Sequence, residues 1–111
     1  MRILTSPVDN EVVVLEIEGA IDAHTARELD RALKELLAQG HSRLVLDVSQ
    51  VIFISSAGLR VIVYADREAS GRGGQVRIGG LDLQVRRVFE MAALDECLQL
   101  CNSCQDALEG W

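Results

Sequence analysis

Several stretches of the chain carry the apolar patterns of β-strands. In residues 11–18, Val13, Leu15 and Ile17 share one face while Glu16 and Glu18 lie on the other, which is typical of a half-buried strand. Residues 44–48 form a nearly continuous apolar run, as expected for a central strand covered on both faces. A second apolar run follows at 51–54, residues 75–78 alternate again, and residues 2–5 are candidates for an edge strand.

Apolar residues at helical spacing predict the helices between these strands. The predicted helices cover Thr25–Gln39, Ser56–Ser70, a segment around Val85–Ala92 and a few residues after Ser103. Thr25 and Glu28 form a capping box at the start of the first helix, and Gly40 ends it. Ser103 and Asp106 are suited to cap the last helix.

The order of these elements predicts one α/β domain over residues 1–111. Strand, helix, strand, helix and strand in succession favour parallel pairing with right-handed crossovers. In such sheets, function usually resides at the carboxyl ends of the strands. The loops that follow the strands therefore become the first place to look for a site.

Composition and charge exclude several classes of function. The 111 residues are 49% hydrophobic and 25% charged, with one proline, which describes a compact soluble domain. The net charge of −6 repels nucleic acid and anionic lipid, so neither is an expected partner. Serines and an arginine interrupt the longest apolar stretch, residues 51–65, and residues 1–10 do not resemble a secretion signal. We therefore expect a cytoplasmic protein.

Three cysteines, Cys97, Cys101 and Cys104, lie near the end of the chain. An odd number of cysteines in a cytoplasmic protein argues against a disulfide framework. Three thiolates leave a zinc ion short of a ligand unless His24 or His41 reaches it. The simpler interpretation is that the cysteines are buried or half-buried small hydrophobic residues. We expect neither a metal nor a cofactor.

The segment 47–60 contains the strongest indication of function. Its apolar run ends at Ser55 and Ser56, directly before a predicted helix. Unpaired N–H groups and the positive end of the helix dipole would hold a phosphate on a serine there, and that phosphate carries about −1.5 to −2 charges. The alternative interpretation is that serine simply caps the helix, a position that it favours.

No arrangement of residues indicates catalysis, so we do not expect an enzyme. Nothing in the pattern places His24 or His41 beside Ser56. The glycines between residues 71 and 80 end a helix or flank a strand, and no lysine follows them as in a phosphate-binding loop. Asp22 and Asp47 are both expected between a strand end and a helix. They either orient the serine turn and contact a partner, or hydrogen-bond loop backbone.

The order and spacing of several motifs resemble the STAS domain, in particular the stand-alone domains of anti-sigma factor antagonists. The matching segments are Glu18–Asp22 with Thr25-Ala26, Asp47–Ser49, Phe53–Leu59, Arg72–Gly74, and Val88–Glu90 with Leu94-Asp95. Together they cover nearly the whole chain. The resemblance implies a mixed, mostly parallel sheet of about four to five strands, with about four helices packed mainly on one face.

The resemblance also implies partner switching. In such systems the unphosphorylated antagonist binds an anti-sigma factor, which is a serine kinase of the histidine-kinase-like ATPase type, and so frees the sigma factor. The kinase then phosphorylates the antagonist and releases it. We expect a monomer or weak dimer. The expected partner-binding residues, which follow two parallel strands, are Asp22, Ser55, Ser56, Ala57, Gly58 and Leu59.

The chain departs from the family pattern at the phosphoacceptor. Switching members carry Asp-Ser-Ser or Asp-Ser-Thr before the glycine, and the last hydroxyl is phosphorylated. Alignment on Gly58 puts Ser55 at the acid, Ser56 at the first hydroxyl and Ala57 at the acceptor, where no phosphate can be attached. Either Ser56 is the acceptor, or the protein binds its partner without being switched off. A scaffold, or a sensor of a small apolar or nucleotide ligand, remains an alternative function.

Overall fold

The computed structural model describes all 111 residues and contains a five-stranded sheet. Across the sheet the strands are β1 (Arg2–Val8), β2 (Val12–Ile21), β3 (Arg43–Ile54), β4 (Gln75–Gly79) and β5 (Gln99–Cys101). β1 pairs antiparallel with β2, and every other neighbouring pair is parallel. The predicted mixed, mostly parallel sheet is therefore confirmed. The short edge strand β5 lies outside the segments that the apolar pattern indicates.

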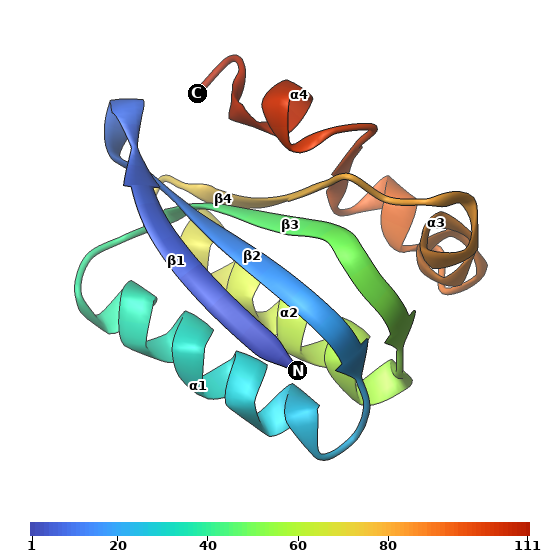
Figure 1. Cartoon of the computed structure of the whole chain (residues 1–111). Coiled ribbons are helices and arrows are strands. Elements are labelled where there is room, and N and C mark those ends of the chain that lie inside the picture. The colour runs from blue at the N-terminus through green and yellow to red at the C-terminus, as the bar shows by residue number, and fades with distance from the viewer.

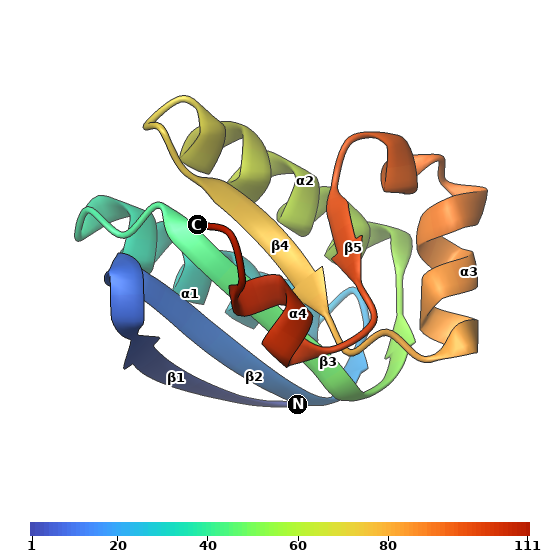
Figure 2. The ribbon, with the colours of Figure 1, turned by 90° about the horizontal axis from the view of Figure 1, so that it is seen from above.

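Four helices cover the sheet unequally. They are α1 (Thr25–Ala38), α2 (Ser56–Ser70), α3 (Leu83–Met91) and α4 (Cys104–Leu108). α1 and α2 lie side by side against one face of the sheet, and α4 lies on the opposite face (Figures 1 and 2). α3 contributes Val85 and Phe89 to the same apolar core as α1 and α2. None of the helices combines the length and the apolar character that a bilayer crossing demands.

The continuous apolar run in β3 is explained by a core on each face of the sheet. Leu44 and Leu46 belong to the larger cluster of 23 buried residues, which includes side chains from α1, α2 and α3. Val45, between them, belongs to a smaller cluster of four buried residues that includes Ala107 of α4. Because successive side chains of a strand point to opposite faces, β3 must be apolar at every position here.

β3 is longer than its two separate apolar runs suggest. Residues 44–48 and 51–54 form one strand of 12 residues, and Figure 1 shows that it bends before its end. The strand continues because β2 pairs beside it as far as Ile54, with irregular register between. Asp47 therefore lies in mid-strand, where its Oδ1 accepts a hydrogen bond from Ser49 N at 3.0 Å. The expectation that Asp47 lies between a strand end and a helix is wrong.

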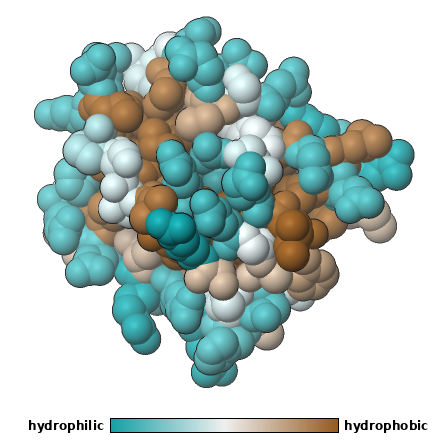
Figure 3. All heavy atoms as spheres, in the orientation of Figure 1, coloured by the Kyte–Doolittle hydropathy of each residue, from teal (hydrophilic) through white to brown (hydrophobic).

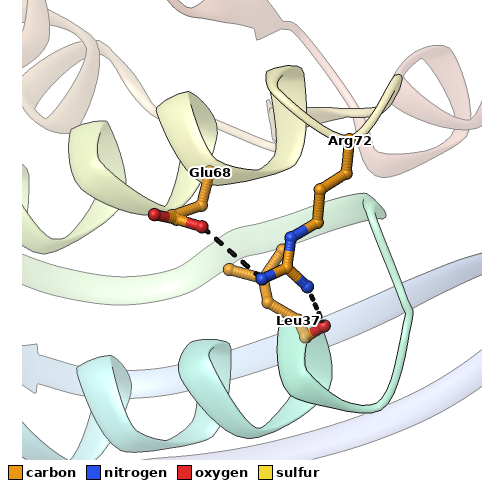
Figure 4. Close-up of polar contacts among 3 residues, drawn as sticks. All are labelled: Leu37, Glu68 and Arg72. Atoms are coloured by element: carbon orange, nitrogen blue, oxygen red, sulfur yellow. Dashed lines mark hydrogen bonds and ion pairs between the residues drawn. The ribbon is translucent and has the colours of Figure 1, made fainter.

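An arginine joins the ends of α1 and α2 that lie away from the serine turn. Arg72, in the turn after α2, donates through Nη1 to the backbone carbonyl of Leu37 (Figure 4). Its Nη2 lies 3.6 Å from Glu68 Oε2 in an exposed ion pair. The Leu37 carbonyl belongs to the last turn of α1, where it also accepts a hydrogen bond from Gly40 N at 3.0 Å. Arg72 thus adds a second donor to this helix end and links the two helices.

A second, buried arginine fastens the C-terminal segment to the sheet. Arg77 of β4 is 7% exposed, and its guanidinium donates to the carbonyl oxygens of Ala107 and Gly110, each at 3.2 Å, and to that of Glu109. The Trp111 ring lies over the guanidinium, with its centroid 3.8 Å away. Carbonyl groups at the end of α4 lack helical partners, and the planar guanidinium of Arg77 supplies the hydrogen-bond donors that they need.

Replacing Arg77 by methionine is expected to release the C-terminal segment and to lower the free energy of unfolding by about 1–3 kcal/mol. Methionine fills much of the same space but donates no hydrogen bond. Trp111 is the only tryptophan, so its fluorescence should become more accessible to a soluble quencher. Arg77→Lys, which keeps the charge without the fork, should give an intermediate result. Unchanged quenching in Arg77→Met would contradict this role.

Candidate functional site

α2 begins at the two serines that the sequence singles out. Ser55 has an extended backbone, with φ −85° and ψ 168°, and its Oγ accepts a hydrogen bond from Gly58 N at 3.2 Å. Its carbonyl accepts from Leu59 N at 3.1 Å, as in the first turn of a helix. Ser55 is therefore the N-cap of α2, and capping engages its hydroxyl. Its half-buried side chain faces the turn that it stabilises.

Ser56 is the first residue of α2 and is exposed to solvent. Unlike the hydroxyl of Ser55, its hydroxyl caps nothing. The N–H groups of Ser56 and Ala57 precede the first donors of the helix, so they remain available to an anion. Of the two hydroxyls in this turn, that of Ser56 is the accessible one.

The loop after β2 has its own hydrogen-bonded cap. Asp22 Oδ1 accepts hydrogen bonds from Thr25 N at 2.8 Å and from His24 N at 2.9 Å. In return, Thr25 Oγ1 accepts from Asp22 N at 2.8 Å. Because Ala26 N donates to the Asp22 carbonyl at 2.9 Å, the first turn of the helix begins at Asp22. The predicted capping box of Thr25 with Glu28 is therefore wrong, since Asp22 caps the helix three residues earlier.

The same hydrogen bonds favour the ionised form of the Asp22 carboxyl. Those from Thr25 are the main reason why the pKa of this exposed carboxyl is lowered. A lowered pKa contributes stability that is present above the carboxyl's unfolded pKa and is lost as the pH falls through the folded pKa. Asp22 therefore presents a negative charge to solvent at neutral pH.

One backbone hydrogen bond joins the Asp22 loop to the serine turn. Ser55 N donates to the Ile21 carbonyl at 2.8 Å, and Ile21 pairs with Ile54 at the ends of β2 and β3. The carboxyl ends of these parallel strands thus bring two segments that are distant in sequence to one edge of the sheet. We call Asp22 and Ser55–Ala57, of which Asp22 and Ser56 are exposed, the loop surface.

Gly58 and Leu59 lie beneath the loop surface. Leu59 is 7% exposed and belongs to the larger core cluster, and Gly58 is also buried. A Cβ atom at Gly58 would lie 2.7 Å from Ile21 Cγ2 and 3.0 Å from Ile54 Cγ1. A bulky charged residue at Gly58 or Leu59 would therefore disturb the core as well as any binding. These two residues position the turn and do not themselves form its accessible face.

Exposed apolar side chains adjoin the loop surface at the end of β3. Ile52 is 77% exposed and Phe53 is 53% exposed. With Val85 and Val88 of α3 they line a small hollow of about 120 Å³. Figure 3 shows apolar surface among hydrophilic side chains on the side of the molecule that Figure 1 presents. The strand pattern alone did not indicate this exposure, because an apolar run normally predicts burial.

The cysteines lie outside this region. Cys101 and Cys104 are half-buried and pack against the smaller core cluster, as expected of small hydrophobic residues. Burial raises the pKa of both thiols. Cys97 is exposed, so the expectation of burial is wrong for this residue. It follows a short helical turn at the edge of the domain and not a packed strand.

Comparison with known proteins assigns the family. The family model of the STAS domain matches residues 4–107. The chain belongs to the STAS domain family. Among relatives of this STAS domain, the anti-sigma-F factor antagonist RsfB of Mycobacterium tuberculosis is 35% identical over 101 residues, which are 91% of this chain and 82% of RsfB.

Solved structures also resemble this STAS domain. An anti-sigma factor antagonist from Mycobacterium paratuberculosis is 30% identical and has a TM-score of 0.83, covering 96% of this STAS domain and 90% of that chain. The Bacillus cell fate determinant SpoIIAA in its phosphorylated form is 19% identical, with a TM-score of 0.71, and covers 89% and 90% respectively. The likeness to SpoIIAA concerns the fold alone. The STAS fold expected from the motifs is confirmed.

Proposed function

We propose that this STAS domain is an anti-sigma factor antagonist. In this proposal it binds a kinase-type anti-sigma factor in the cytoplasm, as a monomer or weak dimer, and so frees a sigma factor. The similarity to RsfB, at 35% identity, supports the proposal. The observation that carries it is the hydrogen bond of 2.8 Å that joins the Asp22 loop to the serine turn. The role is regulatory binding and not catalysis.

The loop surface is the proposed partner contact. Asp22 offers an exposed carboxylate, and beside it Ser56 and Ala57 offer a helix start with small side chains and one accessible hydroxyl. Gly58 allows this turn to approach Ile21 and Ile54 closely, and Leu59 anchors it in the core. A charged, accessible rim on a rigid support suits a surface that must bind and release one partner.

Ser56 is the proposed phosphoacceptor. Its hydroxyl is accessible, whereas that of Ser55 is engaged as a cap and Ala57 has none. A phosphate there would weaken binding because its tightly held water must be removed and because it would repel an acidic partner group. A penalty of about 2.8 kcal/mol weakens a complex a hundredfold. The helix dipole offsets only about 0.3–1 kcal/mol, in the free and bound forms alike.

Incubation with the kinase and ATP is expected to place one phosphate on Ser56, as identified by mass spectrometry. In calorimetric titration, Ser56→Ala should bind the anti-sigma factor whether or not ATP is present. Ser56→Asp should bind more weakly, although less so than the phosphorylated protein, because one carboxylate carries less charge than a phosphate.

Ser55→Ala is the matched control for this experiment. It removes the N-cap, at about 0.5–2 kcal/mol of stability, but should still be phosphorylated on Ser56. Phosphate on Ser55, or on neither serine, would refute Ser56 as the acceptor. In the second case, tight binding would identify an antagonist that is not switched off. Absence of any complex with the anti-sigma factor would refute the proposed function itself.

A further inference from the structure

A groove between α1 and α2 opens directly beside the loop surface. Its volume is about 340 Å³, and its apolar part includes Ala23, Ala57, Val61 and Tyr64. Ala23 follows Asp22, and Ala57 belongs to the serine turn, so the groove continues the loop surface without a break. We call it the α1–α2 groove.

The rim of the α1–α2 groove is cationic. Arg27 and Lys34 of α1 and Arg60 of α2 line it, together with Asp30. Lys34 Nζ lies 2.9 Å from Asp30 Oδ2, but neither Arg27 nor Arg60 takes part in an ion pair of the structure. Both arginines are exposed. Two unpaired guanidinium groups therefore border an apolar floor, on a chain whose net charge is −6.

We infer that the α1–α2 groove receives an acidic amphipathic helix of the anti-sigma factor. The inference rests on the proposed function and names the part of the partner that is recognised. Two adjacent helices form a groove into which the ridge of a third helix packs. An apolar side chain of that helix lies over Ala57 and Val61, while its carboxylates bind the guanidinium groups of Arg27 and Arg60.

Charge complementarity selects this occupant. A basic segment would be repelled by the two arginines, and a wholly apolar one would leave them unpaired and desolvated. An extended strand has no edge to pair with here, because both walls of the groove are helices whose backbone groups bond internally. An acidic helix with one apolar face can cover the apolar floor of the groove and also pair with the arginines at its rim.

Charge reversal tests the inference. In calorimetric titration with the purified full-length anti-sigma factor, Arg27→Glu combined with Arg60→Glu is expected to weaken binding by about tenfold or more. Arg67→Glu, the same charge change on α2 outside the groove, should change the affinity less than about twofold. Raised salt should weaken the wild-type complex more than that of the double variant. A double variant that binds like the wild type would overturn the inference.

Lys34 supplies a second, direct readout because it is the only lysine of the chain and lines the groove. A carbodiimide activates a carboxylate and leaves as a urea when the lysine amine forms an amide with that carboxylate. Mass spectrometry is expected to find Lys34 joined to an aspartate or glutamate in a helix of the anti-sigma factor. Lys34→Arg should lose this link, and Asp30→Asn should increase it by removing the internal carboxylate.

The outcomes separate the two proposals. If the wild-type chain forms no complex with the anti-sigma factor, the proposed function fails and the groove assignment fails with it. If a complex forms but its cross-links come only from the N-terminal amine, the function stands and the groove assignment is overturned. Changing the linked partner carboxylate to lysine should restore binding to the double variant, which would confirm the contact by charge exchange.

Discussion

Replacing Leu46 by alanine is expected to lower the free energy of unfolding by about 2–5 kcal/mol. Leu46 is 0% exposed in β3 and pairs with Leu15 of β2 and Ile78 of β4, which are also 0% exposed. Side chains held in three neighbouring strands cannot move far into the vacated space, so most of the cavity would remain. Urea denaturation followed by circular dichroism measures the loss.

Ile52→Ala is the matched control because it removes a branched aliphatic side chain from the same strand. Ile52 is 77% exposed, so its truncation should change the free energy of unfolding by less than about 0.5 kcal/mol. A loss equal to that of Leu46→Ala would contradict the exposure of the end of β3. It would also remove the basis for treating that end as part of an accessible surface.

Replacing Gly74 by alanine is expected to destabilise the domain by about 3 kcal/mol or more. A Cβ atom at this position would overlap the backbone carbonyl group of Ser42 and lie 2.7 Å from Ser42 Cβ. The segments around Ser42 and Gly74 cannot simply separate, because Gln75 N donates to the Ser42 carbonyl at 2.8 Å where β4 begins beside β3. Thermal and urea unfolding should both show the loss.

Gly71→Ala, three residues earlier in the same turn, separates steric overlap from the mere loss of a glycine. Gly71 has φ −66°, and a Cβ there would meet its nearest neighbour, the Arg67 carbonyl oxygen, at 3.5 Å. Alanine adopts this conformation without strain and restricts the unfolded chain, so the change should be neutral or stabilise by up to about 1 kcal/mol. Similar losses at both positions would refute the proposed close approach of Gly74 to Ser42.

Local sequence predicts one helix cap of this domain correctly and another wrongly. The predicted cap of the last helix is confirmed, since Ser103 Oγ accepts from Asp106 N at 3.0 Å. The capping box predicted at Thr25 is wrong, because β2 continues to Ile21 and delivers Asp22 to the first turn of α1. From the local sequence, Asp22 and Thr25 are equally suitable helix caps. The length of β2 decides which of them caps α1.

The sequence by itself determined the elements that depend on neighbours along the chain. Apolar periodicity indicated the central strands, although β3 as two separate runs, and the two long helices. The two serines before Gly58 indicated a helix start. The motifs, read in order, also indicated the family. These features follow from local spacing, which a linear pattern records completely.

Only the tertiary structure decided which residues of the expected site are accessible. Leu59 is buried, whereas Ser56 is exposed, because α2 packs against the core through one face. Packing of α1 beside α2 also brings Arg27 and Arg60 to the rim of one groove. Burial and proximity between distant segments depend on how the helices and strands pack. Local residue spacing alone does not show which segments come together.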